Sequence, residues 1–291
     1  MATQVIFSTL PIAAKLVLPV IDPLGIAMLR VAGASIAFLL VKWLRRGAAV
    51  TRPRDLAALA GLSMLGVVLN QSLFLLGVER TTAVHANILI TTIPAFTLGV
   101  ALLLGRERAS AAKLAGIALA GAGAIYLGLA RGASAAGATV FGDSLVAINS
   151  LCYAAYLVLS KDLLKRLEPI TVVTYVFLFG TLFMAPVGIP ALLKVDGAQL
   201  NSKVLLVLLY IIAFPSFLTY LLSIWSLKRT ASSLVAMYVY VQPIVTALVA
   251  PAVLGERMTA RSAVASLIIF TGLALATWGH GRTELVSAEV V

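Results

Sequence analysis

The feature that most limits this chain is a series of apolar runs, each close to the roughly 20 residues that an α-helix needs to cross a bilayer. Short polar segments separate the runs, and the apolar residues within a run are continuous. A transmembrane β-barrel is disfavoured, because its strands would alternate polar and apolar residues. The sequence predicts ten spanning helices, at about 3–20, 23–44, 56–78, 82–104, 110–129, 142–164, 169–193, 203–227, 231–254 and 259–279.

The composition supports the same class of protein. Hydrophobic residues make up 61% of the 291 residues and charged residues only 11%, whereas soluble domains are about 45–50% apolar and about 25% charged. A water-soluble enzyme is therefore close to excluded. The predicted fold is an all-α integral membrane protein, in which ten spans leave no room for a separate domain outside the membrane.

The net charge of +11 does not indicate nucleic-acid binding, because the basic residues lie in clusters between the apolar runs. If the N-terminus is cytoplasmic, 14 Lys and Arg fall in inside loops and 6 in outside loops. This bias follows the positive-inside rule. We expect a multi-pass protein with both termini cytoplasmic and a cytoplasmic tail over 280–291.

Cysteine and histidine mainly exclude other classes of site. Cys152 is the only cysteine, so an intrachain disulfide is excluded. His85 and His280 are too few and too far apart to indicate a metal site. We expect neither a metal nor a cofactor.

The chain also repeats itself. A shift of 146 residues places Lys15 on Lys161 and Pro23 on Pro169. A shift of 149 relates a longer segment, in which Arg80-Thr81 falls on Arg229-Thr230, Pro94 on Pro243, and Glu107-Arg108 on Glu256-Arg257. Each half, 1–130 and 141–279, carries five predicted helices. Because five is odd, the second half enters the membrane from the opposite side, which is the inverted repeat typical of secondary transporters.

These motifs resemble a known family. Arg-Thr, then an apolar helix with Pro94 or Pro243, then Gly105–Arg108 or Gly255–Arg257, is similar to the EamA-type repeat of the drug/metabolite transporter superfamily. The resemblance implies an inner-membrane transporter of small metabolites, often an amino acid exporter. It also implies a central cavity formed by helices 1–4 and 6–9. The chain lacks the aromatic-rich fourth helix of some aromatic amino acid exporters, so that substrate is not carried over.

Polar groups inside spans are costly and are therefore the first candidates for function. Each of these groups has an alternative, structural role. For most of them it is an interhelical hydrogen bond or core packing, and for the arginine it is snorkelling or a structural ion pair. Pro94 and Pro243 are predicted to bend their helices as gates, with plain kinking as the alternative. The predicted substrate-binding residues are Arg30, Asn70, Gln71, His85, Asn87, Tyr153, Tyr220, Tyr238 and Gln242.

Two details of this set bear on mechanism. His85 and Asn87 are two residues apart and should point to different sides of their helix, with His85 near the outer surface. All 11 acidic residues fall at or beyond the ends of predicted spans, and we expect Glu107 and Glu256 to serve as caps or ion pairs. Only His85 can titrate near neutral pH inside a span. Transport is therefore expected to be facilitated or only weakly coupled to protons.

The sequence thus predicts a secondary transporter that exports amino acids or related metabolites by alternating access. The alternative is a proton-coupled multidrug efflux protein, although small relatives of that kind need a mid-membrane carboxylate that this chain lacks. An enzyme is disfavoured because no catalytic cluster is visible. The expected partners are the bilayer of a bacterial inner membrane and a small-molecule substrate, with no nucleic acid. The expected oligomeric state is a monomer or weak homodimer.

Overall fold

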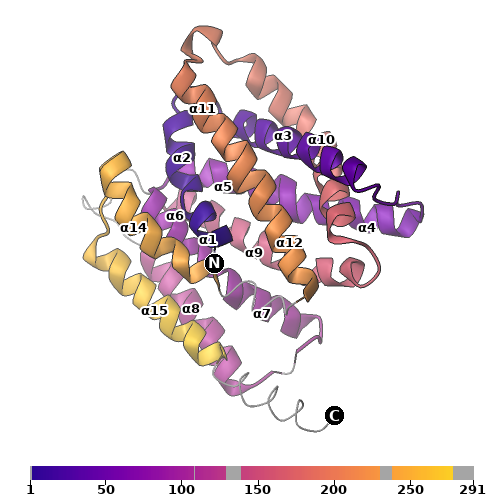
Figure 1. The fold of residues 1–291 in the computed structure, drawn as a ribbon. Helices are drawn as coiled ribbons and strands as arrows, with labels where there is room; N and C mark the ends of the chain where they lie inside the picture. Colours follow the sequence, from indigo (N-terminus) through magenta and orange to yellow (C-terminus); the bar gives the residue numbers. More distant parts are fainter. Residues whose placement is uncertain (1, 108, 129–138, 230–237, 278–291) are drawn as a thin grey trace.

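The computed structural model describes residues 2–107, 109–128, 139–229 and 238–277, and all the elements within these ranges are helical (Figure 1). In the first half they are α1 Ala2–Ser8, α2 Leu10–Val17, α3 Pro23–Leu44, α4 Pro53–Ser63, η1 Met64–Leu69, α5 Asn70–Glu79, α6 Ala83–Ile90, α7 Ile93–Leu103 and α8 Ala111–Gly128. In the second half they are α9 Val140–Leu164, α10 Pro169–Leu193, η2 Gly197–Gln199, α11 Ser202–Ile211, η3 Ile212–Leu218, α12 Thr219–Arg229, η4 Tyr238–Tyr240, α14 Val241–Leu254 and α15 Ala260–Thr277. The tail predicted over 280–291 lies outside the described residues.

Local sequence signals set many of the helix ends. Asp22 caps α3 by accepting a hydrogen bond from the Leu24 N–H, and Pro23 takes the first position, where no N–H is needed. Thr82 and Thr139 cap α6 and α9 in the same way. At their C-terminal ends, α7 is followed by Gly105 and α14 by Gly255, both with left-handed backbone (φ +64° and +70°). These are the two glycines of the repeated motif.

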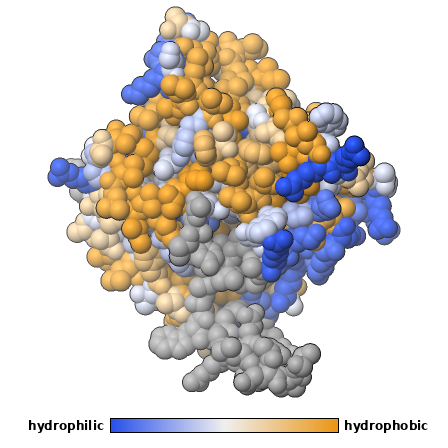
Figure 2. Space-filling model, viewed as in Figure 1, coloured by the Kyte–Doolittle hydropathy of each residue, from blue (hydrophilic) through white to orange (hydrophobic). Residues whose placement is uncertain are grey.

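Six continuous helical segments are long and apolar enough to cross a membrane: Pro23–Leu44, Pro53–Glu79, Ala83–Leu103, Val140–Leu164, Pro169–Leu193 and Ser202–Arg229. Shorter apolar helices occupy Thr3–Val17, Ala111–Leu127, Val241–Leu254 and Ala260–Ala276. Every predicted run therefore contains an apolar helix. Figure 2 shows apolar side chains over most of the visible face, with hydrophilic groups gathered mainly at its right-hand edge. The chain is a multi-pass membrane protein.

The first and fourth predicted spans each contain a local break in the α-helix, although each still runs as one helical segment, Thr3–Val17 and Ala83–Leu103. The first is interrupted between α1 and α2, and the fourth between α6 and α7. At the first interruption the Ser8 carbonyl accepts hydrogen bonds from Asn87 Nδ2 (2.9 Å) and Thr246 Oγ1 (3.1 Å). Other helices thus supply the partners that a broken spanning helix requires, because no water is available in hydrocarbon.

Two π-helical segments lie at related places in the two halves. η1 falls inside the helix that runs from α4 to α5, and η3 falls inside the helix from α11 to α12. The 149-residue shift places Met64–Leu69 within the range of η3. A π-helical turn widens the helix and redirects backbone groups, and such turns often occur beside functional sites.

The helices α8 and α15 pack along each other at one side of the molecule (Figure 1). Their close approach depends on glycine: a Cβ added at Gly272 would lie 2.6 Å from the Ala120 nitrogen, and one at Gly116 2.4 Å from the Gly272 carbonyl oxygen. Larger side chains would push the two helices apart. This pair is peripheral, and the remaining helices surround the centre.

Candidate functional site

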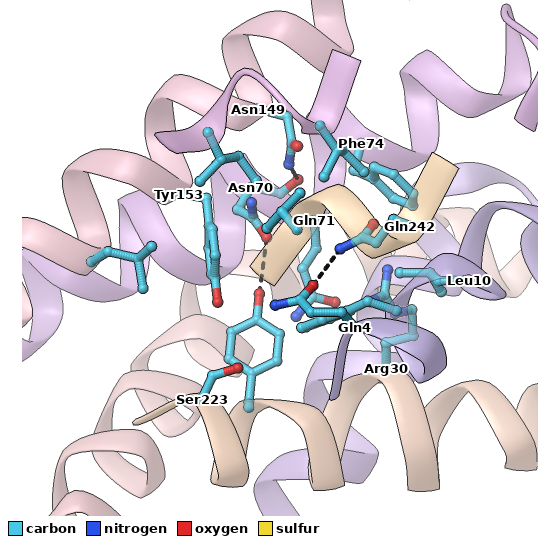
Figure 3. A pocket seen from close by; sticks show the side chains of 16 residues that line it. Gln4, Leu10, Arg30, Asn70, Gln71, Phe74, Asn149, Tyr153, Ser223 and Gln242 are labelled. Carbon is cyan, nitrogen blue, oxygen red and sulfur yellow. Dashed lines mark hydrogen bonds between the residues drawn. The ribbon is translucent and has the colours of Figure 1, made fainter. Parts of the chain in front are cut away.

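A cavity lies among the central helices and encloses about 650 Å³ of space free of protein atoms, including its mouth (Figure 3). Both halves of the chain contribute to it, whereas α8 and α15 provide none of its described lining residues. The lining residues are Gln4, Phe7, Leu10, Arg30, Asn70, Gln71, Phe74, Ile90, Ile93, Asn149, Tyr153, Leu157, Tyr220, Ser223, Val239 and Gln242.

Most of the residues predicted to bind substrate meet in this cavity. They come from α3, α5, α9, α12 and α14, which are far apart in the sequence, and Figure 3 shows their side chains around one space. The predicted residues that line it are Arg30, Asn70, Gln71, Tyr153, Tyr220 and Gln242.

Two predicted residues do not line the cavity, and a third lies outside the described side chains. Asn87 is fully buried, and its amide nitrogen donates hydrogen bonds to the Ser8 carbonyl oxygen and the Thr246 hydroxyl. His85 points elsewhere, as its separation from Asn87 predicts, and only 4% of it is exposed. Both were polar positions in a span, and packing directed them to protein partners. The side chain of Tyr238 lies outside the described part of the chain.

Arg30 is the one charged residue among those that line the cavity, and only 2% of it is exposed. Its Nε donates to Ser216 Oγ (3.0 Å), while its Nη1 has no hydrogen-bond partner. None of the ion pairs in the described ranges includes it. Of the alternatives left open by the sequence, neither snorkelling nor an ion pair describes this arginine.

The Tyr220 side chain ties the two π-helical regions together across the cavity. Its hydroxyl lies 3.0 Å from the Gly66 carbonyl oxygen in η1 and 2.9 Å from Asn70 Oδ1. Asn149 Nδ2 in turn donates to the Asn70 carbonyl oxygen. A Cβ at Gly66 would lie 2.3 Å from the Tyr156 ring, so glycine permits this approach of η1 to α9. These polar groups stabilise the wall of the cavity.

Two glutamine side chains behave differently. The Gln71 amide lies near the Tyr220 hydroxyl, but neither its Nε2 nor its Oε1 has a hydrogen-bond partner among the described residues. Gln242 donates from Nε2 to Gln4 Oε1 (2.6 Å), while its own Oε1 is unpartnered. Buried polar groups are normally hydrogen-bonded, and exceptions need an explanation. A bound solute would supply the missing partners.

Sequence reasoning did not select several residues of the cavity, among them Gln4, Asn149 and Ser223. Asn149 met the criterion used for the others, an amide inside a predicted span. The repeat carried a further signal. The 149-residue shift relates four pairs of lining residues: Gln71/Tyr220, Phe74/Ser223, Ile90/Val239 and Ile93/Gln242. The 146-residue shift adds Phe7/Tyr153.

The two prolines predicted as gates lie beside interruptions of their helices. Pro94 is at the start of α7, directly after the break at Thr91–Thr92. Pro243 is near the start of α14, which follows the short 3₁₀ segment η4. Both interruptions border the cavity, through Ile93 and Val239.

A second polar group, the Asp143 cluster, consists of Thr81, His85 and Asp143 and joins the start of α6 to the start of α9. The Thr81 hydroxyl lies 2.5 Å from Asp143 Oδ1, and His85 Nδ1 lies 3.2 Å from Oδ2. Asp143 is in the first turn of its helix, as the sequence predicts, yet it is only 5% exposed. No atom of this cluster is buried without a partner.

The two glutamates of the repeated motif are structural, as predicted. Glu256 accepts hydrogen bonds from the backbone N–H groups of Ala83 (2.8 Å) and Val84 (3.3 Å), and so caps α6 from the second half of the chain. Glu107 forms an ion pair with Lys113 (2.8 Å). Neither carboxylate lines the central cavity.

The comparisons with known proteins agree with this architecture. The family model described as "EamA-like transporter family" matches residues 1–129 and again 140–278. The chain belongs to the EamA-like transporter family. This EamA-like chain is 30% identical over 279 residues to an uncharacterized transporter of Archaeoglobus fulgidus, covering 94% of each chain. A second transporter from that organism is 26% identical and is covered over 88% of its length.

A solved crystal structure has the same fold, with a TM-score of 0.70 over 97% of this chain and 96% of that one. The identity is 18%, so the likeness concerns the fold alone. The family is one of transporters and not of enzymes, which agrees with the prediction from the sequence. The resemblance to the drug/metabolite transporter superfamily is confirmed.

Proposed function

We propose that this EamA-like transporter exports small metabolites, amino acids or related compounds, across a bacterial inner membrane by alternating access. One observation carries the proposal: a buried central cavity, lined from both halves, in which Arg30, Gln71 and Gln242 keep polar atoms without protein partners. A solute of mixed polarity fits such a lining, because Tyr153, Tyr220 and apolar side chains surround the polar groups. None of the described lining residues is acidic, so nothing there pairs with a cationic drug.

The proposed architecture is ten spans in two inverted five-helix repeats. Two family-model matches, at 1–129 and 140–278, support it, as do the π-helical segments η1 and η3 and the lining pairs related by 149 residues. An axis relating two inverted halves places the substrate site at their interface, near the middle of the membrane. In this scheme the interruptions beside Pro94 and Pro243 are the hinges.

Transport by reconstituted vesicles tests the function. Purified protein should move one or more members of a broad amino acid panel down an imposed gradient, and overexpression in cells should lower the intracellular level of the same solute. Vesicles that move none of the panel would show that the substrate class is wrong.

Cysteine labelling tests the orientation. With Cys152 replaced, single cysteines at positions 50 and 283 should react with a membrane-impermeant reagent only after the cells are opened. Labelling of both positions in intact cells would place the termini outside and reverse the proposed topology.

A further inference from the structure

Arg30 carries a buried charge that forms no ion pair within the described part of the chain. It lies in the eighth position of α3, about 12 Å along the helix axis. Its neighbours in the cavity are amides, hydroxyls and apolar side chains. Removing a cation from water without a counterion costs several kcal/mol. The one hydrogen bond to Ser216 does not offset a cost of this kind.

Packing does not require a charge at this position. The 146-residue shift that places Pro23 on Pro169 places Arg30 on Val176 in α10, which is fully buried and apolar. The corresponding site in the other half is therefore filled by a side chain with no charge. Arg30 therefore departs from the repeat, and it lines the cavity, whereas Val176 does not.

The side chains around Arg30 indicate which kind of solute would neutralise its charge. A guanidinium offers a planar set of N–H donors that matches a carboxylate. The unpartnered Gln71 amide adds a donor and an acceptor, and Gln242 Oε1 adds an acceptor held in place through Gln4. Phe7, Leu10 and Ile90 provide an apolar wall. Arg30 is the one cation among the described lining residues, so it would neutralise a solute with one negative charge. A solute with two negative charges would keep one of them without a partner.

We infer that the transported solute is a small organic monocarboxylate with an apolar body, and that Arg30 binds its carboxylate. The inference rests on the proposed function, because it takes the central cavity as the site of the transported solute. An α-amino group is not required for charge balance, because none of the described lining residues is an anion that would pair with it. The N–H donors of such a group would face amide and hydroxyl oxygens, among them the unpartnered Oε1 atoms of Gln71 and Gln242.

Matched solutes test the inference directly. Leucine, 4-methylpentanoate and leucinamide share one body and differ in the carboxylate and the amino group, and the valine and phenylalanine series extend the comparison to other sizes. In thermal unfolding of the purified full-length protein, both acids of at least one series should raise the Tm, since a ligand that binds only the folded state stabilises it. The amide of that series should raise it much less. Equal shifts by acid and amide, or no shift by any acid, would overturn the inference.

Variants of Arg30 separate binding from structure. Arg30→Met keeps an unbranched, flexible side chain, although a shorter one, and removes the charge, and it should lower the affinity for the effective acid at least tenfold. The Tm of the ligand-free protein should be unchanged or higher, because an uncompensated buried charge is lost. Arg30→Lys keeps the charge without the planar donors and should bind acids more weakly than the wild type while remaining folded. Arg45→Met, at the exposed C-terminal end of the same helix, is the control for the change in net charge.

Unchanged acid affinity in Arg30→Met would exclude the assigned role, and so would a large loss of Tm without ligand in both Arg30 variants. The two proposals fail in distinguishable ways. If the vesicles transport amides or neutral solutes but no acids, the protein is a transporter and the proposed anion site is refuted. If the protein binds acids in a way that depends on Arg30 but its vesicles transport nothing from the amino acid panel, the anion site is supported and the proposed transport is refuted.

Discussion

The central cavity and the Asp143 cluster are both buried polar regions between helices, and they differ in one respect. In the cluster, the Asp143 carboxylate satisfies Thr81 and His85, and no buried atom lacks a partner. In the cavity, Arg30, Gln71 and Gln242 keep atoms without partners. A satisfied polar network stabilises one arrangement of helices, whereas an unsatisfied one needs something else to complete it. Burial of polar groups alone therefore does not distinguish the two regions, whereas their hydrogen bonds do.

The largest expected effect of a substitution is on the stability of the Asp143 cluster. Asp143→Ala leaves the Thr81 hydroxyl and the His85 ring without their acceptor in a buried site, and should lower the free energy of unfolding by about 2–4 kcal/mol. Thermal or denaturant unfolding of the purified protein measures it. Asp162→Ala, which removes a half-exposed carboxylate, is the control and should cost much less. Equal losses would show that the cluster is not a structural network.

Gln71→Leu tests the opposite expectation in the cavity. Both polar atoms of the Gln71 amide lack partners, so the ligand-free protein should keep or gain stability, by up to about 1 kcal/mol. The affinity for the transported solute should fall about tenfold, the effect of losing a hydrogen bond to a charged group. Ligand titration followed by thermal unfolding gives both quantities. If the variant loses stability and keeps its affinity for the solute, Gln71 has a structural role and does not bind the solute.

Tyr220→Phe sharpens the comparison within the cavity itself. The hydroxyl of Tyr220 is bonded to Gly66 and Asn70, so its removal should cost about 1 kcal/mol of unfolding free energy, the net value of an ordinary hydrogen bond. The ring contacts with Phe7 and Phe177 are retained. The change in unfolding free energy should therefore have opposite signs in Tyr220→Phe and Gln71→Leu, although the 149-residue shift relates these two lining residues. The same sign for both would contradict the distinction.

The smallest expected effect concerns pH. His85 faces Asp143 from α6, and Glu256 and Arg257 line the adjoining groove with it, away from the central cavity. Because no carboxylate is among the lining residues of the cavity, an imposed pH gradient should change transport by less than about twofold, and His85→Gln should remove that dependence while substrate still binds. Uptake into vesicles with and without a gradient measures both. Strong accumulation that survives His85→Gln would point to a proton site elsewhere, with Glu107 and Glu256 examined next.

The positions of the helices were largely predictable because their cause is local. Each predicted run contains an apolar helix, and Asp22, Thr82 and Thr139 mark helix starts that side-chain oxygens stabilise. The interruptions were less predictable. The break between α1 and α2 depends on Asn87 and Thr246, which belong to other helices and reach the Ser8 carbonyl only in the folded chain.

The candidate site was predicted in part for the same reason. The cost of polar groups in hydrocarbon selected six residues that line the cavity, and it selected His85 and Asn87, which do not line it, by the same argument. The six are Arg30, Asn70, Gln71, Tyr153, Tyr220 and Gln242. A helix turns about 100° per residue. Whether a polar side chain meets a cavity or a neighbouring helix thus depends on how each helix is rotated, and the composition of one helix does not set that rotation.

The sequence by itself determined the class of protein, the series of apolar helices and the motifs that the two halves share, because continuous apolar runs and repeated motifs are properties of the chain read in order. Tertiary structure alone decided which buried polar groups are satisfied. Asp143 meets His85 across 58 positions of sequence, and Arg30 meets Ser216 across 186. The first contact completes a pair of polar groups and the second leaves Nη1 open. That difference depends on distances between helices, which packing sets and no single segment encodes.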